Sequence, residues 1–433
     1  MNSDARLAWR NVAIFLSITC IIVGGVVVRP LMYLAFLYCV GLVVFTKSNA
    51  EIYSLLYFLL PFATIFKFYP GSTSLLTFVL LIYELRLIIA QREFPKDFFL
   101  FWFLYFVYVL IGMGSAYTDA VKQIFIPIFF FFGMQDNIRK SVKTYSIAYT
   151  NAVIITSILA IFRHQIPNLE SFVNVKTTRM DVEVFVQRFS GLWGDPNYYS
   201  TNLILAFTLT MYFHLKGIYS FKRAMLYYSA LTVFGAMTGS KTFLIMLGIV
   251  FIFLIIEAFK NGRYVIGLIC ISAGASVVFL VLNGTITAFN TTIDRLINSA
   301  DSLSSLTTFR SDLWINYLNT FLEYPLKALI GNGLGKGYTY TAPHNTIIDY
   351  IDIYGLIGSG LFLLTCYTVI REKAAAKRLL NYIPAIALFI LYCTLSMIRY
   401  FDYPFQITIV CMLIYSAHME EFDNEEGRSV SCI

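Results

Sequence analysis

Residues 98–116 read FFLFWFLYFVYVLIGMGSA and contain no charged side chain. A helix needs about 20 apolar residues to cross the hydrocarbon core of a bilayer, so this stretch predicts a transmembrane helix. Similar runs recur along the chain of 433 residues, of which 58% are hydrophobic and 13% charged. Ordinary soluble domains carry about 25% charged residues. The composition excludes a water-soluble fold and predicts an all-α, polytopic integral membrane protein.

The apolar runs predict about fourteen transmembrane helices in a single membrane domain covering residues 1–433. The sequence contains no internal repeat, no low-complexity linker and no separate soluble domain. The predicted helices cover residues 11–29, 31–46, 52–67, 73–90, 98–116, 120–135, 144–162, 197–214, 224–239, 242–258, 264–283, 346–369, 381–397 and 404–418.

The distribution of Lys and Arg predicts the orientation, because cytoplasmic loops keep an excess of positive charge. Most Lys and Arg residues fall on the side of the N-terminus when the two longest loops are left out. We therefore expect both termini in the cytoplasm and two long loops, residues 163–196 and 283–344, on the outer side. The net charge of +7 is then a topology signal and not the footprint of a nucleic-acid partner.

The seven cysteines indicate neither a disulfide nor a thiolate metal site. Six lie in apolar runs and Cys432 lies near the end of the sequence, so no pair shares an aqueous loop. The 17% aromatic content suits lipid contact and interfacial anchoring more than redox chemistry. We expect no metal and no cofactor.

The second long loop predicts an amphipathic helix near the membrane interface. Residues 307–323 carry apolar side chains at helical spacing, and Pro325 helps to end the helix. The apolar positions are Phe309, Leu313, Tyr317 and Phe321.

Polar residues that are unusual in a lipid-embedded protein form three groups on the predicted outer side. The first, residues 188–197 (RFSGLWGDPN), places Arg188 beside a turn in which Asp195 or Asn197 is suited to cap the next helix. The second, residues 238–242 (TGSKT), contains Lys241 in a tight connection. Lys241 is equally suited to reaching lipid headgroups and to binding an anion.

The third group combines Arg310 and Trp314 with the glycine run 331–337 (GNGLGKG) and His344. An interfacial salt bridge explains Arg310 as simply as a ligand does. The glycine run lacks the spacing and the preceding strand of a phosphate loop, so a flexible connector is favoured over a nucleotide site.

His344 is one of four histidines and stands at the predicted start of a membrane helix. Asn345, Asp349 and Asp352 follow on one face of that helix, at i, i+4 and i+7. Carboxylates inside a membrane helix are costly, so we expect them to face a cavity or a partner.

Together the three groups predict an outward-opening cavity lined by cations, which suits a lipid-linked pyrophosphate. Arginine can neutralise a diphosphate leaving group through bidentate hydrogen bonds without a metal. A histidine at a helix start is favoured as the neutral base, whereas a nearby diphosphate favours its charged form, so the protonation state of His344 stays open.

The order and spacing of these motifs resemble the O-antigen ligase/polymerase superfamily, over roughly residues 188–358. The Gly-Asp-Pro-Asn turn after Arg188 is similar to that of its Wzy-type polysaccharide polymerases. The other matching motifs are Arg310-x3-Trp314, Pro325, Gly331-x-Gly333-x-Gly335, His344-Asn345 and residues 354–358 (YGLIG).

The resemblance implies a GT-C-type, metal-independent, inverting glycosyltransferase in the bacterial inner membrane, with its site on the periplasmic face. Its substrates would be glycans linked to undecaprenyl diphosphate, and its partners a chain-length regulator and a flippase. By position, Arg310 and Arg188 would bind the diphosphate and His344 would activate or orient the acceptor hydroxyl. Relatives commonly have Arg at the position of Lys241. Lysine supplies the positive charge there but lacks the planar pair of N–H donors of arginine.

Four functions remain open, and one of them, a structural or assembly factor, would leave Arg310 and His344 replaceable without loss of product. A polymerase would add the growing glycan to another lipid-linked repeat unit, in O-antigen, capsule or exopolysaccharide synthesis, whereas a ligase would add it to the lipid A core. The Gly-Asp-Pro-Asn turn and the many Tyr and Phe residues favour the polymerase. A lipid-linked oligosaccharide flippase would show repeat symmetry and charges in both halves, which the sequence lacks. Candidates to stack on sugars, or to anchor at the interface, are Tyr198, Tyr199, Tyr338 and Tyr340.

Overall fold

The structure is a computed structural model and is all-helical. It describes residues 3–90, 94–135, 141–173, 189–215, 218–260, 262, 264, 267–268, 271–272, 310–336 and 339–373. Every regular element in these residues is a helix, which confirms the all-α prediction for this part of the chain. The chain divides into two compact units, each formed by two separated stretches.

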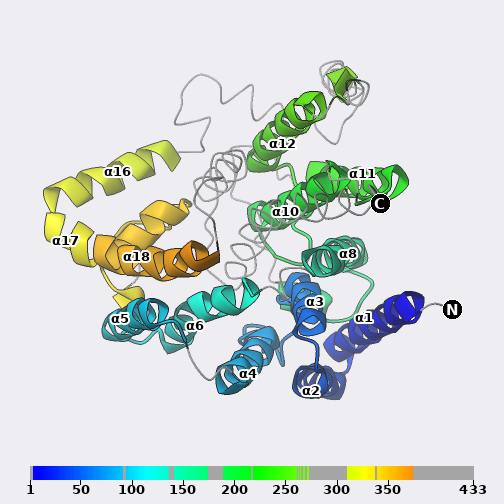
Figure 1. Ribbon diagram of the computed structural model, residues 1–433, viewed down its shortest axis with the longest axis horizontal. Helices are drawn as coiled ribbons and strands as arrows, with labels where there is room; N and C mark the ends of the chain where they lie inside the picture. The colour runs from blue at the N-terminus through cyan, green and yellow to red at the C-terminus, as the bar shows by residue number, and fades with distance from the viewer. Residues whose placement is uncertain are drawn as a thin grey trace, which may run out of the picture. The chain divides into compact units, whose positions relative to one another are not determined.

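Unit 1 combines Met1–Tyr83 with Lys143–Asn298. In it α1 packs along α2, and α10 packs against α11 and α12 (Figure 1). The buried rings of Tyr57 and Tyr145 stack with their centroids 4.9 Å apart, so part of the tyrosine content belongs to the core. The helices are α1 (Ser3–Val27), α2 (Arg29–Phe45), α3 (Asn49–Leu59), η1 (Leu60–Phe62), α8 (Val142–Ile161), α9 (Leu169–Val173), α10 (Pro196–Leu215), α11 (Phe221–Met237) and α12 (Lys241–Lys260).

Unit 2 combines Glu84–Val142 with Ser299–Ile433, and α4 (Leu75–Ala90) leads into it from unit 1. Helix α18 packs along α5 and also contacts α6 and α17. At one end of this unit, Arg371 of α18 pairs with Asp97 of α5 at 2.6 Å. The helices are α5 (Lys96–Gly112), α6 (Tyr117–Gly133), α16 (Arg310–Glu323), α17 (Pro325–Ile330), η2 (Leu334–Lys336) and α18 (Thr346–Lys373).

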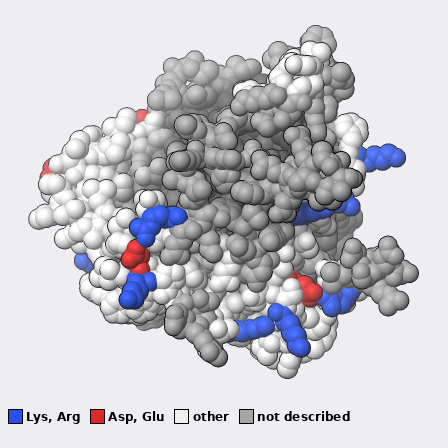
Figure 2. Space-filling model, viewed as in Figure 1, with Lys and Arg blue, Asp and Glu red and all other residues white. Residues whose placement is uncertain are grey.

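Three helices in the described residues are long and apolar enough to cross a membrane. They are Arg10–Val27, Val142–Ile161 and Thr346–Val369. Large apolar side chains also stand open on the surface, with Leu37 64% and Ile111 81% exposed. On the face seen in Figure 2, the described surface is mostly uncharged, with a few small groups of charged side chains. These features support a membrane protein.

The count of fourteen spans stays a prediction. The predicted helices 381–397 and 404–418, and most of 264–283, lie outside the described residues. The other predicted runs coincide with helices to within a few residues, with two exceptions: α1 begins at Ser3, eight residues before the predicted run 11–29, and 52–67 is a helix only to Phe62. The single-domain assignment and the GT-C architecture also stay predictions.

Helix α18 is not the continuous helix that the apolar run predicts. Gly355 has φ 62° and ψ −176°, which interrupts the helical backbone in its first half. Only glycine adopts this conformation at little cost. The break exposes backbone carbonyls of α18, and these bind the glycine run before it, as described below.

Candidate functional site

Side chains of α16 form hydrogen bonds with residues 339–343, the segment that leads to His344. Trp314, Tyr317 and Thr320 are spaced by three along α16 and so share one side of it. The Trp314 Nε1 donates to the Pro343 carbonyl at 2.7 Å, and the Tyr317 hydroxyl donates to the Thr341 carbonyl at 2.7 Å. Thr320 Oγ1 lies 2.6 Å from the Tyr340 hydroxyl. Three consecutive contacts therefore hold the segment in place.

The Tyr317 hydroxyl stays protonated near neutral pH and remains a donor. Burial, and after it the charge of Asp352, raises the pKa of Tyr317 above its usual value, against a hydrogen bond from the Tyr340 backbone. Its bond to Thr341 therefore persists over the physiological pH range.

The apolar face of α16 packs inside unit 2. Tyr317 and Phe321 form a buried cluster with Ala328 of α17 and Ile348 of α18, against which Leu313 and Trp314 also pack. The helix predicted for residues 307–323 is thus confirmed from Arg310 to Glu323. Its periodic face contacts protein, whereas Ile315, Leu318 and Leu322 are exposed and available to lipid. Phe309 lies outside the described residues.

His344 and Asn345 form the entry to α18. His344 has φ 50°, a left-handed conformation that is uncommon for a residue with a side chain. The Asn345 Oδ1 accepts from the backbone N–H groups of Ile347 at 3.0 Å and Ile348 at 3.2 Å. Asn345 is therefore the helix cap, and His344 precedes it, half-buried, at the helix start as predicted.

Arg310 lies near the same end of unit 2. It is the half-buried first residue of α16, four residues before Trp314. Four residues of helix rise about 6 Å, and the Trp314 indole contacts the residue that precedes His344. The contact from Trp314 thus brings together the Arg310 motif and the His344 motif, which are more than thirty residues apart in the sequence.

The two carboxylates of α18 are buried, and Asp352 has a defined structural partner. Both Asp349 and Asp352 are 1% exposed. Asp352 accepts from Asn332 Nδ2 at 2.7 Å, from the Thr339 N–H at 3.2 Å and from the Thr339 hydroxyl. We expected these carboxylates to face a cavity or a partner. For Asp352 the partner is another segment of the same chain, which contributes Asn332 and Thr339.

Residues 331–333 of the glycine run are packed against α18, in contrast to the flexible connector that the sequence predicts. The N–H of Asn332 donates to the Asp352 carbonyl at 2.7 Å, and the N–H of Gly333 donates to the Ile353 carbonyl at 2.9 Å. A Cβ on Gly331 would lie 2.4 Å from the backbone N of Gly355. The run packs backbone to backbone against the break in α18, which requires glycine on both sides.

Unit 1 joins the other two polar groups of the sequence. The Asp195 Oδ1 accepts from the N–H of Asn197 at 2.7 Å and of Tyr198 at 3.4 Å, so Asp195 caps α10. Ser240 Oγ donates to the Asn197 Oδ1 at 3.1 Å and lies 3.3 Å from Ser200 Oγ. The Gly-Asp-Pro-Asn turn thus contacts the Thr-Gly-Ser-Lys-Thr turn directly.

The two turns continue into neighbouring segments of unit 1. Arg188 lies outside the described residues, but the N–H of Phe189 donates to the Met237 carbonyl at 3.2 Å. Lys241 is the first residue of α12 and directly follows Ser240. The Lys241 backbone therefore adjoins the contact between the two turns.

The tyrosines predicted to stack on sugars differ in how far they are exposed. Tyr199 is 1% exposed and its hydroxyl bonds to Ser157, so it is a core residue and not a sugar platform. Tyr198 is half-buried, Tyr340 is 50% exposed, and Tyr338 lies outside the described residues.

The sequence interpretation missed Glu84. This residue is fully buried in α4, and neither carboxylate oxygen has a hydrogen-bond partner in the described part of the chain. The same reasoning that singled out Asp349, a carboxylate within an apolar run, applies to residues 75–90 (LLTFVLLIYELRLIIA).

Comparisons with protein-family models, with curated proteins and with solved structures give no match to this chain.

Proposed function

We propose that this protein is a polysaccharide polymerase of the bacterial inner membrane. It transfers a growing glycan from undecaprenyl diphosphate to the non-reducing end sugar of an incoming lipid-linked repeat unit. The proposal makes it a metal-independent, inverting glycosyltransferase acting on the periplasmic face, in the synthesis of O-antigen, capsule or exopolysaccharide.

The observation that carries the proposal is the hydrogen bond from Trp314 to Pro343. Through this contact a cation at the start of α16 and a histidine at the start of α18 share one end of unit 2. Fixed guanidinium charge stabilises a leaving diphosphate, and a positioned imidazole can accept a proton from a hydroxyl. A stabiliser for the leaving group and a base for the nucleophile are the two groups that glycosyl transfer from a lipid diphosphate needs.

In the proposed reaction, the acceptor hydroxyl oxygen attacks the anomeric carbon of the donor glycan. The new glycosidic C–O bond forms as the bond from that carbon to the phosphate oxygen breaks, with inversion at the carbon. Undecaprenyl diphosphate leaves with the electron pair, and Arg310 neutralises its developing charge. His344 accepts the hydroxyl proton and returns it to water.

The test is an electrophoretic glycan ladder from cells that lack the gene, complemented with native protein or with His344→Ala. We expect a single repeat unit in the null strain, a ladder with native protein, and no ladder with His344→Ala at equal protein level, because the base is lost. His164→Ala is the matched control, since the His164 side chain is exposed and its Nδ1 lies 3.0 Å from a carboxylate oxygen of Glu170 in unit 1. It should restore the full ladder.

Other outcomes contradict the proposal in distinct ways. Bare lipid A core with polymer left on the carrier lipid identifies a ligase, which shares this chemistry but uses another acceptor. Failure of repeat units to reach the outer face identifies a flippase. A full ladder from His344→Ala removes His344 from the mechanism.

A further inference from the structure

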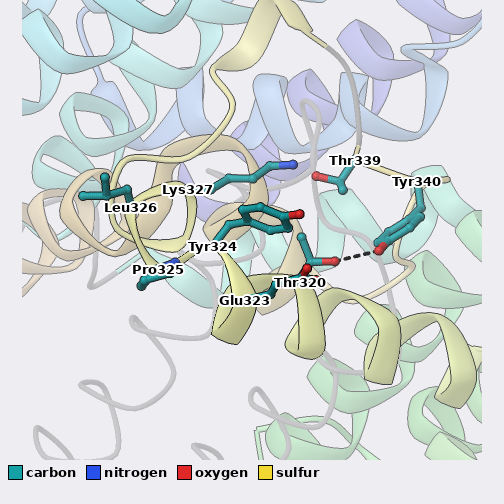
Figure 3. A pocket seen from close by; sticks show the side chains of 8 residues that line it. All are labelled: Thr320, Glu323, Tyr324, Pro325, Leu326, Lys327, Thr339 and Tyr340. Carbon is teal, nitrogen blue, oxygen red and sulfur yellow. Dashed lines mark hydrogen bonds between the residues drawn. The ribbon is translucent and has the colours of Figure 1, made fainter.

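A concave site lies beside the segment that leads to His344. A cavity of about 690 Å³ opens between the end of α16, the start of α17 and residues 339–340 of unit 2. Figure 3 shows its polar lining, to which Thr320, Glu323, Tyr324, Lys327, Thr339 and Tyr340 contribute. The sequence interpretation assigned none of its α16 and α17 residues to a site.

The lining combines two exposed aromatic rings with short polar groups. Tyr324 is 55% and Tyr340 50% exposed, and they enter the cavity from different segments (Figure 3). The rest of the lining consists of two threonine hydroxyls, one carboxylate, one ammonium and the apolar side chains of Pro325 and Leu326. Apolar surface with a few placed hydrogen-bonding groups is typical of small-molecule sites, and aromatic rings offer large, rigid contact area.

The charges favour an uncharged ligand. Glu323 and Lys327 contribute one negative and one positive charge, so the lining has no net charge for a diphosphate. A hydrogen bond to Glu323 raises the pKa of Tyr324, so the Tyr324 hydroxyl stays a donor. Carboxylate, ammonium, hydroxyls and ring faces together suit a polyhydroxylated ring, whose hydroxyls donate and accept and whose C–H faces pack on aromatics.

The cavity lies within oligosaccharide reach of His344. His344 is four positions after Tyr340, so their Cα atoms are at most about 14 Å apart. The bonds from Thr320 to Tyr340 and from Trp314 to Pro343 hold both ends of this segment on α16. A sugar in the cavity and a hydroxyl at His344 can therefore belong to one short glycan.

We propose that this cavity binds sugar residues of the acceptor repeat unit adjacent to the sugar whose hydroxyl reacts. This inference rests on the proposed function and deepens it, because it assigns acceptor recognition to the end of α16 and the start of α17. Tyr324 and Tyr340 provide the contact surface, and Glu323 and Lys327 orient the hydroxyls.

The test measures binding of free repeat-unit oligosaccharide, released from the cell's own lipid-linked oligosaccharide by mild acid, to the purified full chain. Calorimetry compares native protein with Tyr324→Ala, Tyr340→Ala and Tyr340→Phe. We expect each alanine variant to lose about tenfold in affinity, since the contact between the aromatic ring and the sugar is lost, whereas Tyr340→Phe keeps the ring and most of the binding. Tyr69→Ala removes an exposed tyrosine of unit 1 and should bind like native protein.

Turnover separates this inference from the proposed function. The Tyr324→Ala variant should raise the acceptor KM with kcat unchanged, whereas His344→Ala should lower kcat. If the ladder experiment identifies a polymerase but Tyr324→Ala and Tyr340→Ala bind oligosaccharide like native protein, the inference alone is wrong. Displacement of the oligosaccharide from the cavity by inorganic pyrophosphate would also overturn it. A null strain with a normal ladder and a native protein that binds no oligosaccharide would overturn both.

Discussion

The indole of Trp314 has a single donor, and it is used on the carbonyl of Pro343, directly before His344. The chain then turns through the left-handed conformation of His344 to the cap at Asn345. His344 thus lies between two residues that side-chain hydrogen bonds hold in place. Its position depends on neighbours that take no part in the proposed chemistry.

Trp314→Phe should lower kcat by about twofold to tenfold without loss of protein. The ring packing survives, but a hydrogen bond with a net value of about 0.5–1.5 kcal/mol is lost, which loosens the segment before His344. Trp102→Phe is a matched control, because the Trp102 Nε1 makes the same kind of bond, to the Ile124 carbonyl at 3.0 Å. In vitro polymerisation rates of the two variants test this; equal rates would show that the Trp314 bond does not position His344.

Arg310→Lys should lose most activity while the protein still inserts into the membrane. Lysine keeps the charge but lacks the planar pair of donors that binds a phosphate bidentately. Arg371→Lys, which alters the exposed pair with Asp97, should retain activity. Ladder formation at matched protein levels is the measurement, and a native ladder from Arg310→Lys would remove the bidentate clamp.

At the scale of elements, the glycine run and α18 act as one structure. Gly331 and Gly355 both have positive φ, and each lies where a side chain would overlap the backbone of the other segment. Asn332, Thr339 and Asp352 close this contact with hydrogen bonds. The shape of unit 2 around the candidate site therefore depends on two glycines and a carboxylate that contact no substrate in the proposal.

Gly355→Ala should destabilise the protein by roughly 1–3 kcal/mol or more, because the residue has φ 62° and the new Cβ would lie 2.3 Å from the Leu329 carbonyl oxygen. Gly360→Ala is the control in the same helix, since nothing lies within 4 Å of its Cβ. That change should leave stability equal or slightly higher. Thermal unfolding in detergent compares the two, and similar midpoints would contradict the tight contact at Gly355.

At the scale of the whole molecule, the two ends of α18 in unit 2 carry different functional groups. Its start carries His344 and the cap, and its end carries the Arg371–Asp97 pair. The apolar stretch Thr346–Val369 has 24 residues and is long and apolar enough to cross a bilayer core. If the Arg371 end is cytoplasmic, as the charge distribution predicts, His344 lies toward the outer face.

Topology reporters test this orientation. Alkaline phosphatase fused after residue 170 should be active, because that loop is predicted to lie outside, whereas a fusion after residue 373 should be inactive. Green fluorescent protein at residue 373 should fluoresce. The reverse pattern would place His344 on the cytoplasmic side and contradict a periplasmic polymerase.

The amino-acid sequence by itself determined the helical, apolar character of the chain and most helix bounds, because hydropathy and caps such as Asn345 are local properties. It also singled out Arg310, Trp314 and His344 as one group. Only the tertiary structure decided what their neighbours do. The break at Gly355, the inward face of α16, the burial of Tyr199 and the cavity beside Tyr324 arise from contacts between distant segments. A one-dimensional pattern of apolar residues contains no information on which of those contacts form.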